Sequence, residues 1–359
     1  MNGNGHRVSV DRIDATRFEE FENHQEVVFI HDAKTGLRGF IAIHNTNLGP
    51  AIGGTRYWHY ASDDEGLRDA LRLSRAMTYK CAIASVPFGG GKGVLLSPQQ
   101  NSIKTEEYLI SYTEALKAIG TPFYTGEDVG LNERDVEVLE AHSDRIVGRP
   151  EVGGLPAKWA ALSVFYSMET ALLKQFGNAS FDAKTVAVKG LGGVGIELCA
   201  LLANAGADII GADINATRVA LAQKRHPNIR IVPSSAIHKE RADVYSPCAL
   251  GDELNERTIE ELGSRVICGG ANNQLASRAD GKRLFDKGIL YVPDYVANAG
   301  GLISVADELN EGGYSQDRVE KKILAIKATL EQIVDMSRAE SQPTDKVADM
   351  LAEKRFLKK

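Results

Sequence analysis

The chain has 359 residues, of which 43% are apolar and 25% are charged, a composition typical of a folded globular protein. Its formal net charge of −6 argues against nucleic acid or an anionic membrane surface as the main partner. No apolar run approaches the roughly 20 residues that a membrane-spanning helix needs, and no apolar leader stretch is present, so we expect a cytoplasmic protein.

Length and cysteine content set two further expectations. A chain of this length is too long for one ordinary hydrophobic core and predicts two domains. We place the first domain at residues 1–148 and the second at residues 149–336. The 4 cysteines are far apart and form no Cys-x-x-Cys motif, which predicts reduced thiols and no metal centre.

The first domain is predicted to contain strands followed by helices. Two β-rich runs, EVVFIHD (26–32) and GFIAIHN (39–45), are separated by a short segment with Gly36 and predict a hairpin. Apolar residues at helical spacing after Asp63 predict an amphipathic helix with an acidic first turn. A further helix is expected over residues 105–120.

The second domain shows a different pattern. A Gly/Pro-rich break at 145–156 precedes a predicted helix over 158–177, with Gly177 as its C-cap. Six short β-rich runs then alternate with helices or loops, which predicts a parallel sheet: TVAVKG, DIIGAD, IRIVP, ADVYSP, RVICGG and ILYVPD. Two closing helices are expected at 319–336 and 344–357. The C-terminal segment 337–359 is expected to pack back on the first domain.

The clearest motif is a glycine-rich turn of the kind that binds dinucleotides. The spacing G-x-G-x-x-G occurs between a predicted strand (185–189) and a predicted helix (193–204). The first glycine allows a tight turn, and the second lets backbone N–H groups and the positive end of the helix approach a pyrophosphate. A turn that needs glycine only for packing is the alternative. The expected cofactor-binding residues are Gly190, Gly192, Gly193, Val194 and Gly195.

An acidic residue further along indicates which dinucleotide is bound. Asp213 ends the next predicted strand, 18 residues beyond Gly195. Its carboxylate can accept hydrogen bonds from both ribose hydroxyls and would repel a 2′-phosphate, so the sequence predicts NAD rather than NADP. Arg218 lies close by in the sequence and keeps NADP open as the alternative.

Small residues and uncharged amides follow the later strands of this series. Ligands of open parallel sheets bind at the carboxyl ends of the strands, and side chains of this kind suit a flat nicotinamide ring. Tight turns without a binding role are the alternative. The residues predicted to contact the cofactor at these ends are Pro247, Cys248, Ala249, Ala271, Asn273 and Asn298.

A second glycine-rich stretch, VPFGGGKGVLL (86–96), is predicted to be a loop that does not bind phosphate. A phosphate-binding P-loop has the form G-x-x-x-x-G-K-[ST]. Val86 stands at the position of its first glycine, and Gly93 follows Lys92 in place of a hydroxyl residue. The stretch therefore needs another explanation.

Three charged residues near this stretch form a candidate reaction site. Lys80 ends the preceding predicted helix, and a turn and return of the chain would let it line one cleft with Lys92. Asp128 lies downstream between small residues. One cation can bind a substrate carboxylate, a lysine shielded from water can act as a base, and an aspartate can transfer protons. Each residue taken alone is also compatible with a solvated surface charge.

These residues together resemble a known family. From about Val27 to Phe356 the chain is similar to the NAD-dependent L-amino-acid dehydrogenases of the leucine, phenylalanine and valine group, relatives of glutamate dehydrogenase. The most specific runs are LGPAIGGTR (48–56), RLSRAMTYK (72–80), GGGK (89–92), GEDVG (126–130), GLGGVG (190–195), SPCALG (246–251), GANNQL (270–275) and PDYVANAGGLISVADEL (293–309).

The resemblance implies both a fold and an activity. The fold would be a two-domain α/β structure, with an N-terminal substrate-binding and oligomerisation domain, a Rossmann-type NAD-binding domain and a cleft between them. The activity would be the reversible oxidative deamination of an L-amino acid to a 2-oxo acid and ammonia. A homo-oligomer would carry it out, with hydride passing to NAD.

The resemblance also implies roles for individual residues. Lys80 would bind the substrate carboxylate, Lys92 would be the base that activates water, and Asp128 would transfer protons. The backbone at two glycines would help to bind the substrate, and two amides would lie near the nicotinamide and the substrate. These four residues are Gly53, Gly54, Asn273 and Asn298.

The side-chain pocket implied by the family is apolar in this chain. Its positions are Ile52, Gly126, Leu302 and Val305. A glutamate side chain would leave an unpaired carboxylate there, so we expect a hydrophobic substrate and leave aromatic and branched-chain amino acids open. One segment departs from the family, because Ala157-Lys158-Trp159-Ala160 replaces the usual S-P-x-T run and lacks the threonine that supports the nicotinamide.

Two other functions stay open on the sequence alone. One is a different nicotinamide-dependent oxidoreductase, for instance one acting on 2-hydroxy acids, although no histidine lies beside a strand-end motif. The other is a catalytically weakened member of the family with a binding or regulatory role, to which only the departure at 157–160 points.

Overall fold

The computed structural model describes residues 8–99 and 102–357, which form two compact units. The first unit runs to Gly148 and includes the chain from Arg355 onward, and the second spans Arg149–Lys354. Of the segment 337–359, therefore, only the last residues join the first unit, and the remainder belongs to the second. The reason is local, because the ring of Phe356 packs against His44 and Tyr79.

The first unit is built on a six-stranded mixed sheet in the order β1-β2-β3-β5-β4-β6. The strands β2 and β3 form the predicted antiparallel hairpin, and Gly36 turns the chain with a φ of +76°. The strands β5 and β6 both run parallel to β4. The bounds are β1 (Ser9–Arg12), β2 (Glu26–Asp32), β3 (Leu37–Asn45), β4 (Ala51–Trp58), β5 (Gly89–Leu96) and β6 (Phe123–Glu127).

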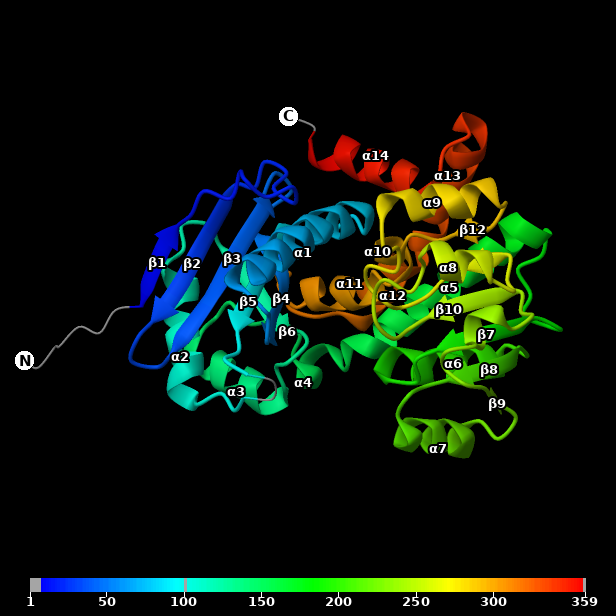
Figure 1. The fold of residues 1–359 in the computed structure, drawn as a ribbon, viewed down its shortest axis with the longest axis horizontal. Helices are drawn as coiled ribbons and strands as arrows, with labels where there is room; N and C mark the ends of the chain where they lie inside the picture. The colour runs from blue at the N-terminus through cyan, green and yellow to red at the C-terminus, as the bar shows by residue number, and fades with distance from the viewer. Residues whose placement is uncertain (1–7, 100–101, 358–359) are drawn as a thin grey trace, which may run out of the picture. The chain divides into compact units, whose positions relative to one another are not determined.

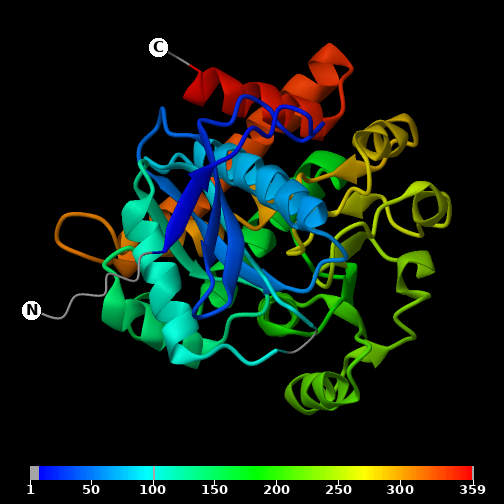
Figure 2. The same ribbon diagram turned by 60° about the vertical axis from the view of Figure 1, so that its left-hand side comes forward.

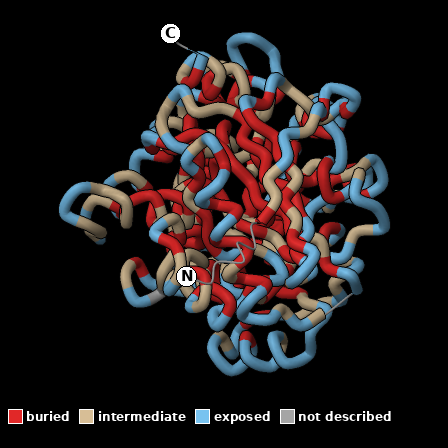
Figure 3. The backbone as a smooth tube through the Cα atoms, turned by 90° about the vertical axis from the view of Figure 1, so that its left-hand side faces the viewer, coloured by how far each residue is buried: buried red, intermediate tan, exposed pale blue. Residues whose placement is uncertain are grey.

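Helices cover both faces of this sheet (Figures 1 and 2). On one face α1 (Asp63–Ile83) buries Leu71 against Phe40 and Val94. On the other face α2 (Glu106–Ala118) and α3 (Glu133–His142) bury residues such as Tyr112 against the strands. Figure 3 shows the buried segments of the backbone in the interior and the exposed segments around them. Both helices predicted from the sequence are confirmed.

The GGGK stretch is the central strand β5, so its interpretation as a loop is wrong. Its glycines are explained by close packing on both faces. A Cβ atom at Gly90 would lie 2.2 Å from the backbone nitrogen of Thr78 in α1, and one at Gly91 would lie 2.7 Å from the ring of Phe123. The first half of the strand can therefore be buried between the layers only because it has no side chains at Gly90 and Gly91.

The second unit contains the predicted parallel sheet, with the strand order β12-β11-β10-β7-β8-β9 of a doubly wound dinucleotide-binding fold. All of its strand pairs are parallel. The two-domain α/β fold expected from the sequence is thus confirmed. The strands are β7 (Thr185–Lys189), β8 (Asp208–Ala212), β9 (Arg230–Ile231), β10 (Val244–Pro247), β11 (Val266–Ile267) and β12 (Leu290–Tyr291).

The helices of the second unit agree with the sequence in place but not in every boundary. The helix α5 ends at the predicted C-cap Gly177, whose φ is +76°. The helix expected over 319–336 is two helices that meet at Ala325, a residue with helical backbone angles and no capping side chain. The helices are α4 (Pro150–Gly153), α5 (Pro156–Phe176), α6 (Gly193–Asn204), α7 (Ala216–Arg225), η1 (Ile237–Lys239), α8 (Glu256–Glu260), α9 (Arg278–Asp286), α10 (Asp294–Ala297), α11 (Gly300–Asp307), α12 (Gln316–Leu324), α13 (Ile326–Glu340) and α14 (Thr344–Phe356).

Within residues 8–99 and 102–357, we find no helix with the length and apolar character that crossing a membrane requires.

The packing of β5 leads to a stability prediction. We expect Gly90→Ala to lower the free energy of unfolding by about 1–3 kcal/mol, because the added methyl group would overlap the backbone of α1. Gly120→Ala is the matched control, since its Cβ would lie 3.3 Å from the ends of the Arg12 and Glu26 side chains, which can move. Urea denaturation of the three proteins measures the difference. Equal losses in both variants would contradict the packing explanation.

Candidate active site

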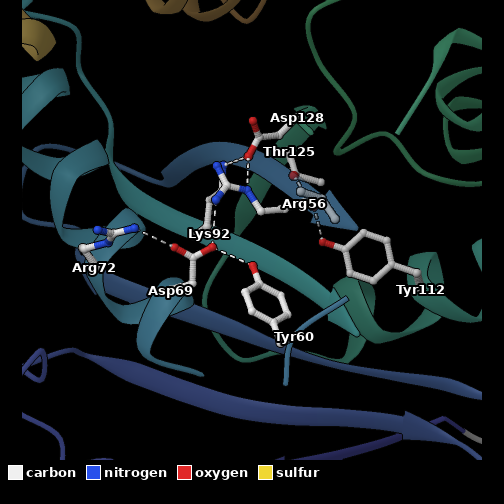
Figure 4. Close-up of polar contacts among 9 residues, drawn as sticks. Arg56, Tyr60, Asp69, Arg72, Lys92, Tyr112, Thr125 and Asp128 are labelled. Atoms are coloured by element: carbon white, nitrogen blue, oxygen red, sulfur yellow. Dashed lines mark hydrogen bonds and ion pairs between the residues drawn. The ribbon is translucent and has the colours of Figure 1, made fainter. Parts of the chain in front are cut away.

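The candidate active site of the first unit centres on a buried ion pair (Figure 4). Lys92 projects from the middle of β5, and its side chain is only 7% exposed. Its Nζ atom lies 2.5 Å from Oδ2 of Asp128, which directly follows β6. The structure thus brings together the two residues predicted to be catalytic.

Two glycines of β4 make room for this pair. A Cβ atom at Gly54 would lie 2.9 Å from Cβ of Asp128 and 3.3 Å from Nζ of Lys92. A Cβ atom at Gly53 would lie 2.0 Å from the carbonyl oxygen of Gly91 on the neighbouring strand. Gly54 therefore lets the two charged side chains lie against backbone, and Gly53 is required for close strand packing.

A second cation, Arg56, contacts the same carboxylate. Its Nε atom lies 3.2 Å from Oδ2 of Asp128, and its side chain is 22% exposed. Burial opposes ionisation of Asp128, but the charges of Lys92 and Arg56 outweigh burial and hold the pKa of that carboxyl well below its usual range. Asp128 is therefore a carboxylate at neutral pH. Arg56 was not among the site residues predicted from the sequence, although it ends the run LGPAIGGTR.

Lys80 is a half-buried residue of α1. The position of Met77, three residues earlier, indicates which side of the helix Lys80 is on. The Cγ atom of Met77 lies 3.2 Å from where a Cβ of Gly53 would be. Residues three apart share a helix face, so Lys80 lies one turn further along the side of α1 that faces β4. The structure therefore places Lys80 on the same face of the sheet as Lys92.

The predicted side-chain pocket residues are divided between the two units. Ile52 is buried in β4, and Leu302 and Val305 lie on α11. A Cβ atom at Gly126 would lie 2.2 Å from the carbonyl oxygen of Val147. The absence of a side chain at Gly126 thus has a packing reason that does not depend on substrate.

In the glycine turn of the second unit, Gly190 and Gly195 are needed for close backbone packing and Gly192 faces open space, as expected for a dinucleotide-binding loop. Gly190 has a φ of +98°, and a Cβ atom at Gly195 would lie 1.9 Å from the carbonyl oxygen of Gly190. By contrast, the nearest atom to a Cβ at Gly192 would be 3.8 Å away, on Arg218. The helix α6 begins at Gly193, and Gly192 gives it no side-chain cap. Open space before uncapped N–H groups suits a pyrophosphate.

Asp213 follows β8 beside this turn. Its side chain is 4% exposed, and its two oxygens accept hydrogen bonds from the backbone N–H groups of Leu191 and Asn215, each at 2.8 Å. Nη1 of Arg218 lies 3.8 Å from Oδ2 of Asp213. Asp213 therefore closes the turn as well as placing a negative charge next to it.

The predicted strand-end residues lie close together. Gly270 donates its backbone N–H to Sγ of Cys248 at 3.4 Å, and Ala271 donates to the carbonyl oxygen of Pro247 at 2.9 Å. The side-chain amide of Asn298 donates to the carbonyl oxygen of Gly270 at 3.1 Å, while its own buried Oδ1 has no partner within the described residues. Ala249 approaches the glycine turn, because its nitrogen would lie 2.8 Å from a Cβ of Gly190.

Two more residues shape the loop after β11. Asn273 adopts a left-handed backbone conformation with a φ of +53°. The fully buried Gln274 donates from Nε2 to the carbonyl oxygens of Gly269 at 2.9 Å and Ala271 at 3.0 Å. Gln274 was not predicted from the sequence, because only the folded loop shows which carbonyls its amide reaches.

The segment that departs from the family starts α5. Trp159 is buried and donates its indole N–H to the carbonyl oxygen of Gly153 at 2.7 Å. A Cβ atom at Gly300 would lie 2.0 Å from the carbonyl oxygen of Trp159, so α11 packs closely on this turn. Lys158 is exposed, and Ala160 is buried. Trp159 thus has a packing role in the second unit.

No group of three or more histidine, cysteine, aspartate or glutamate side chains in residues 8–99 and 102–357 is arranged to hold a metal ion.

The charges around Asp128 lead to a pH prediction. A carboxyl with a lowered pKa stabilises the fold above its ordinary pKa of 3.8, and this contribution is lost as the pH falls below that value. We therefore expect Asp128→Asn to lower the free energy of unfolding by about 3 kcal/mol near neutral pH, because the buried Lys92 loses its carboxylate partner and Arg56 keeps only Asp69. The gap to the unmodified protein should narrow below about pH 4.

Denaturation at several pH values measures that gap. Asp63→Asn is the matched control, because the Asp63–Arg38 pair is about half exposed and should contribute no more than about 1 kcal/mol. A gap for Asp128→Asn that stays constant from neutral to acid pH would contradict the electrostatic explanation.

Comparison with known proteins identifies the family. The Glu/Leu/Phe/Val dehydrogenase dimerisation domain matches residues 24–145, and the Glutamate/Leucine/Phenylalanine/Valine dehydrogenase domain matches residues 213–358. The chain is 39% identical to leucine dehydrogenase of Bacillus subtilis over 95% of this chain and 93% of the relative. It is 39% identical to phenylalanine dehydrogenase of Bacillus thermotolerans over 96% of this chain and 91% of the relative.

A solved structure agrees with these relatives. The L-tryptophan dehydrogenase of Nostoc punctiforme is 35% identical, covers 93% of this chain and 96% of its own, and superposes with a TM-score of 0.80. Both halves of the chain match, and the glycine turn, the parallel sheet and the buried Lys92–Asp128 pair are all present. The chain therefore belongs to the glutamate/leucine/phenylalanine/valine dehydrogenase family.

Proposed function

We propose that this amino-acid dehydrogenase catalyses the reversible oxidative deamination of a hydrophobic L-amino acid, with NAD as the hydride acceptor. The observation that carries the proposal is the buried Lys92–Asp128 ion pair, which lies against the backbone of β4 at Gly54. A desolvated lysine held against a carboxylate is an arrangement suited to moving protons rather than to stabilising a fold.

The glycine turn of the second unit fits a dinucleotide. The N–H groups at the start of α6 would hold the pyrophosphate, with Gly192 giving access and Asp213 beside the ribose. The unpartnered Oδ1 of Asn298 would accept from the carboxamide of the nicotinamide. When bound, NAD supplies the acceptor for the hydride that leaves the α-carbon.

The first unit would bind and orient the amino acid. Lys80 would pair with the α-carboxylate from its place on α1, and the backbone at Gly53 and Gly54 would lie beneath the substrate. Asp128, ionised at neutral pH, would accept a hydrogen bond from the amino group and take up a proton from it. These contacts would fix the α-carbon in one orientation.

Lys92 would act on the water molecule that attacks the imine. It is buried and its Nζ atom is held at one point by Asp128, so a neutral lysine there can remove a proton from water without rearranging. The proton would pass to Lys92, and ammonia would leave as the carbonyl of the 2-oxo acid forms. The buried position also keeps bulk water from competing for the proton.

A hydrophobic substrate follows from the pocket residues. Ile52, Leu302 and Val305 have no polar side-chain atoms, so a charged substrate side chain beside them would have no partner. NAD is favoured over NADP because the fixed carboxylate of Asp213 would repel a 2′-phosphate, although Arg218 at 3.8 Å offsets part of that charge. The dimerisation-domain match supports a homo-oligomer.

The first test of this function is turnover. We expect NADH formation from at least one of L-leucine, L-valine, L-phenylalanine and L-tryptophan, little from L-glutamate, and less with NADP than with NAD. Lys92→Ala should lower kcat by about 100-fold or more, because general-base catalysis typically contributes 10²–10⁴-fold. Lys34→Ala, which changes an exposed lysine in the first unit, is the matched control. Unchanged turnover in Lys92→Ala would refute the base assignment.

A second test separates the two kinds of glycine in the dinucleotide turn. Gly192→Val should leave thermal stability nearly unchanged, because its side chain would enter open space, but it should abolish measurable NAD binding. Gly195→Ala should instead destabilise the protein, because its Cβ would overlap the carbonyl of Gly190. Calorimetry with NAD and a thermal melt on each variant make the comparison. Full NAD affinity in Gly192→Val would place the cofactor elsewhere.

A further inference from the structure

The Lys92–Asp128 pair is one end of a longer chain of charges (Figure 4). Arg56 lies between two carboxylates, with Nε 3.2 Å from Oδ2 of Asp128 and Nη1 2.8 Å from Oδ2 of Asp69. Tyr60 donates its hydroxyl to the same Oδ2 of Asp69 at 2.6 Å, and Arg72 donates to Oδ1 of Asp69 at 3.2 Å. Charges of opposite sign thus alternate from α1 across β4 to β5.

The two central residues of this series of charges, Asp69 and Arg56, are held in place by their surroundings. The side chain of Asp69 is only 9% exposed, and that of Arg56 is 22% exposed. Burial opposes the charge on Arg56, but Asp128 and Asp69 outweigh burial and raise its pKa. Burial and the nearby Asp69 raise the pKa of Tyr60, so its hydroxyl stays a hydrogen-bond donor. The planar guanidinium contacts the two carboxylates through two different nitrogens, Nε and Nη1, in one rotamer.

Arg56 and Lys92 compete for one oxygen atom. Both cations contact Oδ2 of Asp128, so the charge of Arg56 repels a protonated Lys92 and offsets part of its attraction to Asp128. When Lys92 gives up its proton, Asp128 still has Arg56 as a partner. Its carboxylate is therefore never left buried and unpaired, a state that would hold the proton on Lys92.

We propose that Arg56 is a positioning residue that tunes proton release from Lys92 through Asp128, and that Asp69 and Tyr60 hold Arg56 in the required place. The proposal rests on the proposed function, because it takes Lys92 as the base. The charged and titratable groups on the elements around the pair are Arg56 from β4, Tyr60 after β4, Asp69, Arg72 and Lys80 from α1, and Glu127 from β6.

The proposal predicts shifts of opposite sign for two substitutions. Arg56→Gln removes a positive charge, so Lys92 should keep its proton to a pH about one unit higher, which is about a tenfold smaller neutral fraction at a fixed pH. Asp69→Asn removes a negative charge and frees Arg56 for Asp128, so the Lys92 titration midpoint should move to lower pH. Arg56→Lys keeps the charge and should return the midpoint toward that of the unmodified enzyme.

NMR of lysine-labelled enzyme tests the shifts without requiring turnover. The Lys92 signal is assigned from the Lys92→Arg spectrum, and its midpoint is followed in the unmodified enzyme and the three variants. Arg38→Gln is the matched control, because it removes an exposed arginine on β3 that also pairs with α1. If Arg56→Gln fails to fold, Asp69→Asn alone tests the direction of the shift in the Lys92 midpoint. The proposal is overturned if the Lys92 midpoints of Arg56→Gln and Asp69→Asn equal that of the Arg38→Gln control. It is also overturned if both midpoints move in the same direction.

The pH profile of kcat/KM for deamination is the second readout. Its acid limb should move up in Arg56→Gln and down in Asp69→Asn, whereas a packing defect would lower the whole profile without moving it. Failure of the unmodified enzyme to oxidise any amino acid in the panel would refute the proposed function. The NMR midpoints would still decide whether Arg56 controls the Lys92 proton, so the two failures can be told apart.

Discussion

The buried contact between Lys92 and Asp128 is the interaction around which the candidate active site of the first unit is arranged. Two charges can be taken out of water only when they are paired closely and hydrogen-bonded further. The contact of 2.5 Å meets the first condition, and the additional contact from Arg56 at 3.2 Å meets the second. The Lys92–Asp128 contact also needs a residue without a side chain on the adjacent part of β4. Gly54 meets this need, because a Cβ atom there would crowd both Asp128 and Lys92.

Glycine has several distinct physical roles in this chain, although its two glycine-rich motifs look similar in the sequence. In β5, Gly90 and Gly91 let a central strand lie against layers on both faces. In the dinucleotide turn, Gly190 and Gly195 allow backbone to meet backbone, whereas Gly192 faces open space. Only the last position is the kind that a ligand needs. A glycine-rich motif therefore indicates a binding site only where the structure leaves the space unfilled.

This difference explains what the sequence could and could not predict. The hairpin around Gly36 and the parallel strands of the second unit depend on local turn chemistry and short-range hydrophobic patterns, and both were predicted correctly. The strand β5 was mistaken for a loop, because its glycines are explained by Thr78 and Phe123, which are distant in sequence. The roles of Arg56 and Asp69 were missed for the same reason, since they lie on different elements and meet only when α1 packs on the sheet.

The balance of charge in this network favours a chemical role over a stabilising one. Buried ion pairs contribute little net stability, and apolar side chains of similar size would often serve the fold equally well. With Lys92 neutral, the carboxylates of Asp128 and Asp69 are still matched by the guanidinium groups of Arg56 and Arg72. The network therefore keeps its carboxylates paired in both protonation states of Lys92. A fold selected for stability alone has no need of that property, whereas a base that must gain and lose a proton in each cycle depends on it.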